Sequence, residues 1–329
     1  MIKLERISKF LLLLPPLFLM LCVPDASHDN PLDPSNNPDY NQIRGYAYSY
    51  YSPHKPLADV QIALKPAELF CTTGDDGHFL FKHLQPGQYN LKTSKEAFQT
   101  TSVQIEFSGY QSEKSVDLFI NALPVIKKVN LYSEHIDQWW PGEIYQLQMN
   151  AIISDMDGIS DIDSVACSIP GMAFYKIFNF TEKPDSFYIS IDDFDLPGGS
   201  LYSVCAESCY IRVTDKATAD TAYGPFFLHR IIEGSPTPIS PTSMQIVTGN
   251  PVFEWQRISL PYLYYQEIQL YQLFPGGLVL IDTVKPIDPQ ITSYVYTKKL
   301  QAGNYVWAIG IRDESFNFSR SKEASFIIE

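Results

Sequence analysis

Short runs of alternating hydrophobic and polar residues recur along the chain, and they predict β-strands. In residues 145–153 every odd position is apolar, and positions 146, 148 and 150 are Gln or Asn. This period of two places one side of a strand in a core and the other in solvent. Turn residues separate such runs at intervals of about eight to twelve residues, and no helical periodicity is sustained. The pattern predicts an all-β chain of consecutive small β-sandwich domains.

The chain divides into five segments. A length of 329 residues allows two or three domains of ordinary size. A stretch rich in Pro, Ser and Thr at 235–243 separates two blocks of predicted strands. We predict a signal peptide (1–22), a disordered tether (23–42) and three β-sandwich modules (43–122, 123–233 and 234–329).

Turn motifs in the first module follow a distinctive order. The segments that carry them are Ile43–Gly45, Pro56–Val60, Thr72–Phe79 and Leu84–Tyr89. Together they resemble the carboxypeptidase regulatory-like domain, a small transthyretin-like sandwich. The resemblance implies an accessory module without a peptidase site.

The other two modules resemble different sandwiches. In the second, the loop Asp155–Ile162 links two predicted strands, as in bacterial immunoglobulin-like domains. The third contains Pro251–Trp255 and Leu300–Trp307, and it resembles a fibronectin type III-like domain. We expect the tryptophans of these two segments, Trp255 and Trp307, in its core.

The N-terminus has the features of an export signal. Three basic residues precede the apolar run Phe10–Leu21, which has the length of a signal h-region and is too short to span a bilayer. Cys22 follows this run directly, as in bacterial lipoproteins, where that cysteine is acylated. Met20 and Leu21 depart from the small residues preferred there, and the alternative is an ordinary signal cleaved near Ala26.

The segment after Cys22 favours lipidation. Asp29–Tyr40 is rich in Asp, Asn and Pro, which keep a chain extended and solvated. It resembles the tethers that follow the acylated cysteine of bacterial surface lipoproteins. The resemblance implies a cell-envelope protein, held at the outer membrane by its lipid and facing the periplasm or the surface.

The charge of the chain excludes some partners. The formal charge is −13, and loss of the signal removes three basic residues and one acidic residue, which leaves −15. Nucleic acids and anionic headgroups require a basic surface, so we expect neither as a partner.

The cysteines after Cys22 allow several states. Cys167 and Cys209 share the apolar phase of predicted neighbouring strands, and they form our candidate disulfide. A Cys205–Cys209 loop and free thiols are the alternatives. Cys71 has no evident partner, and the absence of a Cys-x-x-Cys pair excludes zinc and thioredoxin-like motifs.

Four carboxylates cluster around Gly158 and form a candidate calcium site. Calcium binds six to eight oxygens, and an acidic loop at the end of a sandwich supplies several. The spacing is not that of an EF-hand. The tendency of Asp and Gly to form turns between strands explains these residues as well as a calcium site does. The candidate ligands are Asp155, Asp157, Asp161 and Asp163.

Enzymatic motifs are absent or isolated. The sequence lacks a nucleophile elbow, a His-Glu-x-x-His motif and a phosphate-binding loop. The run Ser319–Lys322 matches the Ser-x-x-Lys pattern without its partner motifs. Asp192, Asp193 and Asp195 would need a deep cleft to act as a glycosidase pair. We predict no catalytic residues.

The exposure of the Trp139 and Trp140 rings distinguishes between two functional hypotheses. The first is a modular spacer, adhesion or docking protein with an unknown protein or glycan ligand. The alternative is a carbohydrate-binding accessory protein of a polysaccharide-utilisation system. Exposed rings favour the glycan binder, whereas buried rings favour the spacer. From the sequence we expect one of the two tryptophans to plug the end of the second sandwich.

We predict that Cys22→Ala releases the protein from the membrane. Each buried methylene contributes about 0.8 kcal/mol, so a multiply acylated cysteine is an effectively permanent anchor. Fractionation of cells into membrane and soluble material measures the change. A variant that still sediments with membranes contradicts the lipoprotein assignment.

Overall fold

A computed structural model describes residues 41–107 and 113–329 of the chain. The predicted signal peptide, Cys22 and the tether up to residue 40 lie outside this part. The described residues form twenty-five strands and four short 3-10 helices, which confirms the prediction of an all-β fold. None of the helices in the described part is long and apolar enough to cross a membrane.

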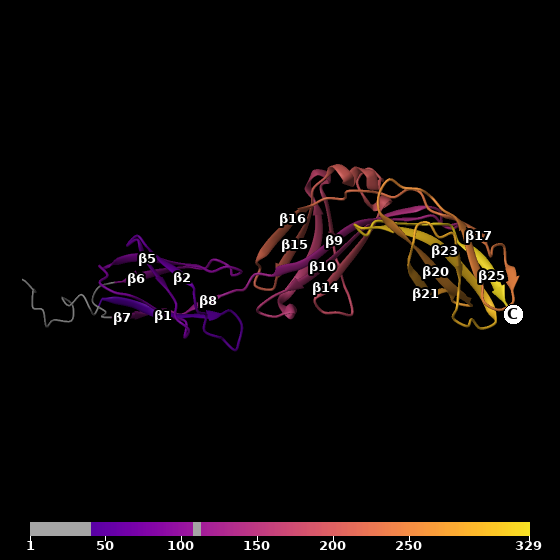
Figure 1. The fold of residues 1–329 in the computed structure, drawn as a ribbon. Helices are drawn as coiled ribbons and strands as arrows, with labels where there is room; N and C mark the ends of the chain where they lie inside the picture. Colours follow the sequence, from indigo (N-terminus) through magenta and orange to yellow (C-terminus); the bar gives the residue numbers. More distant parts are fainter. Residues whose placement is uncertain (1–40, 108–112) are drawn as a thin grey trace, which may run out of the picture. The chain divides into compact units, whose positions relative to one another are not determined.

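The chain divides into two compact units (Figure 1). Of the described residues, unit 1 contains 41–95, 100–107 and 113–120, and unit 2 contains Glu96–Gln99 and Asn121–Glu329. Segment 96–99 pairs with the start of unit 2, because Gln99 N–H donates to Asn121 O and Leu123 N–H donates to Ala97 O, both at 2.8 Å. The second and third predicted modules thus lie in one unit, and their boundary at 233/234 stays a prediction.

Unit 1 consists of two four-stranded sheets. One has the order β4-β1-β7 with β8 also paired to β1, and the other has the order β3-β2-β5-β6. The strands are β1 (Gln42–Ser49), β2 (Gln61–Lys65), β3 (Leu69–Thr72), β4 (His78–Phe81), β5 (Gly87–Ser94), β6 (Ser102–Phe107), β7 (Glu113–Ser115) and β8 (Leu118–Ile120).

Gly45 shows why one of the sequence motifs of unit 1 requires glycine. The strands β7 and β8 both run parallel to β1, and Val116 between them donates its N–H to Arg44 O at 2.9 Å. A Cβ atom on Gly45 would lie 1.7 Å from Val116 O. The close approach of the two backbones therefore excludes a side chain at position 45.

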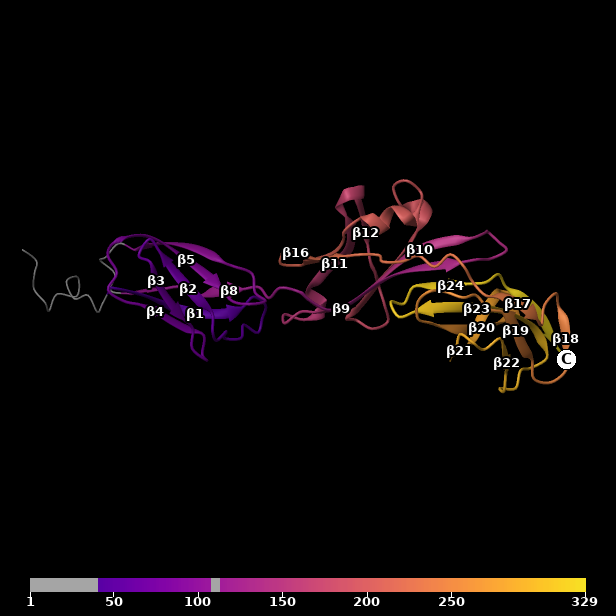
Figure 2. The same cartoon turned by 45° about the horizontal axis from the view of Figure 1, so that its top comes forward.

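The first half of unit 2 is a sandwich with an irregular connection at one end. Its elements are β9 (Val125–Ile136), β10 (Ile144–Ser154), η1 (Ile159–Asp161), β11 (Ile162–Ile169), η2 (Pro170–Met172), β12 (Phe174–Ile177), β13 (Asn179–Phe180), β14 (Ser186–Asp192), η3 (Asp193–Asp195), η4 (Leu201–Ala206), β15 (Cys209–Asp215) and β16 (Asp220–Phe226). One sheet has the order β12-β11-β15-β16, of which β11, β12 and β16 are labelled in Figure 2.

The second half of unit 2 contains nine strands. They are β17 (Thr237–Ser240), β18 (Gln245–Val247), β19 (Val252–Gln256), β20 (Tyr264–Phe274), β21 (Gly277–Ile287), β22 (Ser293–Val295), β23 (Gly303–Asp313), β24 (Phe318–Arg320) and β25 (Ala324–Ile328). A three-stranded sheet has the order β17-β19-β22. Trp255 and Trp307 are 1% and 0% exposed, so the prediction that they belong to the core is confirmed.

One ten-stranded sheet joins the two halves of unit 2. Its main path is β13-β14-β10-β9-β24-β23-β20-β21. Figure 1 labels β14, β10, β9, β23, β20 and β21, and Figure 2 labels β24. The joint is a parallel pair in which Phe318, Ser319 and Arg320 of β24 lie opposite Glu134, His135 and Ile136 of β9. The two predicted sandwiches are therefore hydrogen-bonded to each other through their backbones.

Buried polar side chains complete this joint. Asn317 is 2% exposed, and its Oδ1 accepts the Ser133 N–H at 2.9 Å while its Nδ2 donates to Asp313 Oδ2 at 3.0 Å. Arg230 forms an ion pair with Asp313 at 2.6 Å. These groups satisfy one another, which a buried polar interface requires.

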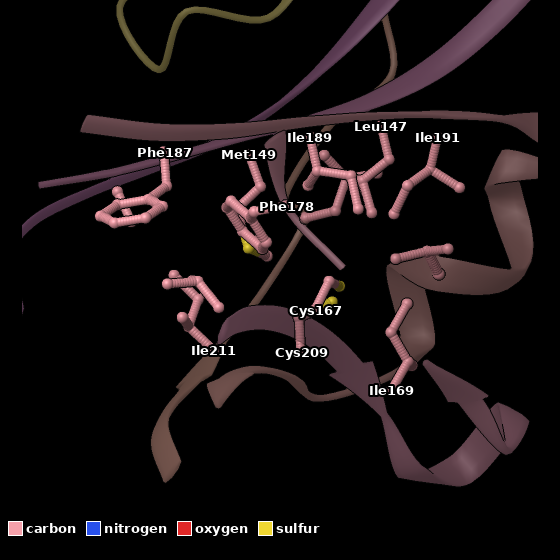
Figure 3. Close-up of a cluster of buried hydrophobic side chains, with 14 of the residues drawn as sticks. Leu147, Met149, Cys167, Ile169, Phe178, Phe187, Ile189, Ile191, Cys209 and Ile211 are labelled. Atoms are coloured by element: carbon pink, nitrogen blue, oxygen red, sulfur yellow. The ribbon is translucent and has the colours of Figure 1, made fainter. Parts of the chain in front are cut away.

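The core of the first half of unit 2 contains two cysteines (Figure 3). The predicted strand faces are confirmed: Leu147, Met149 and Ile153 of β10 are each 0% exposed. Cys167 of β11 lies opposite Ile211 of β15, which makes Cys209 its diagonal neighbour on the same sheet. Diagonal Cβ atoms are about 7 Å apart, farther than a disulfide spans.

The four cysteines of the described part are free thiols in the structure. Burial raises the pKa of Cys167 to about 12 and that of Cys209 to about 11. The Cys167–Cys209 disulfide and the free thiols stay alternative predictions, and the diagonal register favours the free thiols.

We predict that a chain of residues 29–329 contains four reactive thiols after unfolding without reductant. In the folded state Cys205, which is exposed, reacts first, while Cys167 and Cys209 are protected by burial. Timed labelling with a maleimide, followed by mass spectrometry, measures this order. Only two labelled thiols in the unreduced, unfolded chain would establish a disulfide instead.

We predict that Asn317→Ala destabilises unit 2 by about 2–3 kcal/mol, because the buried Ser133 N–H loses its acceptor. Urea denaturation followed by tryptophan fluorescence measures the loss. Asn304→Ala is the control, since Asn304 is exposed on β23, and it should change stability by less than about 0.5 kcal/mol. Equal effects of the two substitutions would contradict a structural role of Asn317.

Candidate functional site

The two candidate platform tryptophans are both exposed. Trp139 and Trp140 lie in the turn between β9 and β10, and their exposed fractions are 72% and 85%. The expectation that one of them plugs the sandwich is wrong. The plug is unnecessary because the core is closed by residues that include Leu196, Leu201 and Val204, which the connection between β14 and β15 supplies.

The turn that carries the tryptophans is held against the second half of unit 2. Asp137 N–H donates to Arg320 O at 3.1 Å, directly after the parallel pair of β9 and β24. The Trp139 indole Nε1 donates to Glu323 O at 2.9 Å, and Lys322 Nζ lies 4.9 Å from the centre of the Trp139 ring. Trp139 is thus oriented by its neighbours, whereas Trp140 projects further into solvent.

A pocket of ≈ 370 Å³ lies beside Trp139. Its walls combine an aromatic ring, prolines, hydroxyl groups and three charged side chains, a mixture suited to a small polar ligand. It is lined by Asp137, Trp139, Ser235, Pro236, Thr237, Pro238, Thr242, Ser243, Ser321, Lys322, Glu323, Ala324 and Ser325.

The charged groups of the pocket are partly paired. Lys322 Nζ lies 3.6 Å from Asp137 Oδ1, and Arg320 donates to Glu323 Oε1 at 2.8 Å. Sequence reasoning did not single out Asp137 and Glu323 as site residues. They are 186 positions apart, and no local pattern connects them.

The acidic cluster predicted from the sequence forms only in part. One carboxylate oxygen from each of Asp155, Asp157 and Asp161 lies within 4.8 Å of the others. Asp163 is exposed and does not belong to this group. The reason is the period of the strand that begins at Ile162: Ile162 is buried, so the next side chain faces solvent.

Asp215 lies near the three carboxylates without being one of the converging group. The pKa of Asp155 is raised to about 6, chiefly by burial and also by the carboxylates of Asp161, Asp157 and Asp215, against the lowering effect of a hydrogen bond from the Asp157 backbone. Burial also raises the pKa of Asp157, with Asp161 and Asp215 as further causes. Asp215 ends β15, far from the loop in sequence, which is why the spacing of the loop alone did not reveal it.

Ser319, His135 and Glu143 have the order of a catalytic triad, with Ser319 and His135 buried and Glu143 exposed. His135 contacts Ser319 Oγ through Nδ1 at 2.9 Å and Glu143 Oε1 through Nε2 at 2.7 Å. Ser319 and His135 are 0% and 2% exposed, so a substrate cannot reach the hydroxyl. The trio joins the two halves of unit 2 and acts as a structural network.

The other catalytic motifs considered from the sequence are also not assembled. Ser319 is buried, while Lys322 extends to Asp137 in the pocket. Asp192 accepts a hydrogen bond from Gln146, and Asp195 pairs with Lys176 at 2.7 Å. Their partners explain these carboxylates without a catalytic role.

Comparisons with known proteins show likeness at the level of β-sandwich architecture. No protein-family model matches the chain, and no curated protein matches it either. The structure is similar to BcpA, the major pilin subunit of Bacillus cereus, with 10% identity and a TM-score of 0.29 over 88% of this chain and 95% of the pilin.

Two further solved structures are similar over part of the chain. A DUF3823 family protein from Bacteroides ovatus has 10% identity and a TM-score of 0.25 over 56% of this chain and 95% of its own. The fibronectin(III)-like modules of Clostridium thermocellum CbhA have 11% identity and a TM-score of 0.27 over 63% of this chain and 93% of theirs.

Proposed function

We propose that this protein is a non-catalytic, lipid-anchored cell-envelope protein that binds a neutral polysaccharide. The main observation that supports this proposal is that Trp139 and Trp140 are exposed beside a polar pocket. This is the arrangement that distinguishes a glycan binder from a spacer with buried rings.

The chemistry of the loop suits a sugar. One face of a pyranose ring is largely C–H, and it packs on an aromatic ring whose face carries negative charge density. The hydroxyl groups of the sugar need donors and acceptors at the edge of the platform. Asp137, Glu323 and Thr237 supply such groups in the pocket, and Lys322 adds a donor.

The charge of the protein favours a neutral glycan over an acidic one. The pocket contains two carboxylates and one ammonium group, and the chain as a whole carries a formal charge of −13. Binding a uronic acid or sulfated sugar would bring like charges together at low dielectric. Uncharged hexoses and pentoses avoid this repulsion.

In this proposal the N-terminal segments determine where in the cell the protein is located. The apolar run 10–21 directs export, acylated Cys22 holds the chain at the outer membrane, and the tether 23–42 spaces the sandwiches from the bilayer. Unit 1 acts as an accessory module of the carboxypeptidase regulatory-like type. The order of its turns and the close approach at Gly45 support this assignment.

A role as an adhesion or docking element is the second candidate. The observation that favours it is the ten-stranded sheet, which joins two sandwiches into one hydrogen-bonded body. Such a body transmits force without a flexible linker inside unit 2. In this role the tryptophans would contact a protein surface, where exposed aromatic side chains are enriched.

The test is a glycan array probed with residues 29–329, followed by titration with the best neutral oligosaccharide. We expect Trp140→Ala to weaken binding at least about fivefold, the equivalent of about 1 kcal/mol of ring contact. Phe194→Ala is the matched control, because Phe194 is 71% exposed on η3 of the same unit.

The outcomes separate the two candidate functions. Binding of a neutral glycan that Phe194→Ala leaves unchanged and Trp140→Ala weakens supports the glycan role. An array without a bound glycan, or equal effects of the two substitutions, rejects it. Trp139→Ala is less informative, because its indole also donates to Glu323 O and holds the turn in place.

A further inference from the structure

We propose that the acidic cluster at the start of unit 2 is a calcium site whose ligands come from two separate segments of the chain. Each ligand is an oxygen atom at or next to the loop 155–161. The ligands are the carboxylates of Asp155, Asp157 and Asp161 and the side-chain carbonyl of Asn121.

The distances within the cluster fit one cation. Calcium–oxygen bonds are about 2.4 Å long, so two ligands of one ion are at most about 4.8 Å apart. Carboxylate oxygens of Asp155, Asp157 and Asp161 all lie within 4.8 Å of one another. Three carboxylates at this separation repel one another in the absence of a positive charge between them.

The loop is folded so that its carboxylates converge. Asp155 Oδ1 accepts the Asp157 N–H at 2.8 Å, and Asp155 O accepts the Gly158 N–H at 3.2 Å. Gly158 has a φ of 108°, a conformation that side chains rarely adopt. The turn continues into η1, where Asp161 is 4% exposed.

A second segment closes the cluster from the other side. Asn121 is 3% exposed, and its Nδ2 donates to Asp215 Oδ2 at 2.7 Å. The following residue, Ala122, donates its N–H to Asp157 Oδ2 at 2.8 Å. Residues 121 and 122 therefore lie between Asp215 and Asp157, next to the carboxylates of the loop.

Two oxygens at this position are buried and accept no hydrogen bond from the described residues. They are Asn121 Oδ1 and Asp155 Oδ2. A buried oxygen without a donor costs free energy, and a cation is the ligand that satisfies several such oxygens at once. The Asn121 oxygen is independent of the clustering of carboxylates, and it makes the acidic loop a candidate metal site.

The types of ligand atom in this cluster favour calcium over the other common metal ions. The cluster contains carboxylates and one amide carbonyl, and neither histidine nor cysteine belongs to it, which disfavours zinc and copper. Magnesium retains most of its water and demands a small octahedral shell, whereas calcium accepts many protein oxygens in irregular geometry. Asp215 is 1% exposed, accepts the Ala219 N–H at 2.8 Å and accepts from Asn121 Nδ2 at 2.7 Å, so it orients Asn121 as a positioning residue.

A bound ion would join two parts of unit 2. It would link the loop after β10 to Asn121, the first residue of unit 2 after Ile120, and Asn121 is in turn hydrogen-bonded to Asp215 at the end of β15. The consequence is a calcium-dependent stability of unit 2, independent of whether the tryptophan loop binds a glycan.

The test is calorimetric titration of residues 29–329 with CaCl2 after removal of metals by EDTA. This chain contains every residue that the structure describes. We expect one ion per chain, a Kd of about 10⁻³ M or tighter and a rise in Tm with calcium. Equal concentrations of MgCl2 should bind at least tenfold more weakly.

Variants identify the ligands. Asp157→Asn and Asp161→Asn should each weaken calcium binding at least tenfold, whereas Asp163→Asn, in the same acidic segment but facing solvent, should leave it unchanged. Circular dichroism verifies that each variant is folded, and the Tm shift of the wild-type chain provides a readout that needs no variant.

Three results would overturn the proposal. The first is a wild-type chain that shows neither heat nor a Tm shift in about 10 mM CaCl2. The second is an Asp163→Asn variant that loses as much affinity as Asp157→Asn. The third is magnesium binding as tight as calcium binding.

Discussion

The parallel pairing of β9 with β24 is the constraint on which the arrangement of unit 2 depends. Three backbone positions on each strand are in register, and this short contact makes one sheet out of the sheets of two sandwiches. Because backbone hydrogen bonds are directional, the joint fixes the register of the two halves as well as their contact. Buried Asn317 adds a side-chain hydrogen bond to the Ser133 N–H, which favours this one arrangement of the two halves.

The candidate glycan pocket is a consequence of this joint. The turn after β9 leaves the sheet one residue beyond the last paired position, and it is held against the segment 320–323 by Asp137 and Trp139. Two walls of the pocket thus come from halves of the unit that are distant in sequence. A substitution that disturbs the pairing of β9 with β24 is therefore expected to alter the pocket, even if it replaces no residue that lines the pocket.

The acidic cluster depends on a different constraint, the burial of charge near the end of a sandwich. Carboxylates in such a place raise one another's pKa, as Asp155 and Asp157 show. A fold that retains them needs a compensating positive charge or a proton. The calcium proposal itself follows from the convergence of three carboxylates and from the two buried oxygens without donors.

The sequence by itself determined the fold class, most of the strand faces and the core roles of Trp255 and Trp307. A period of two is a local property that one strand carries whatever its neighbours are, so Leu147, Met149 and Ile153 were predictable as buried. The same local rule explains why Asp163 faces solvent, although the spacing of the aspartates suggested a fourth ligand.

Only the tertiary structure decided which distant residues meet. The pairing of β9 with β24, the approach of Asn121 and Asp215 to the loop 155–161, and the diagonal offset of Cys167 and Cys209 all depend on register between strands far apart in the chain. Register is set by the packing of whole sheets, which no local pattern encodes. The exposure of Trp140 was decided in the same way, because residues from another connection already close the core that an aromatic plug would have filled.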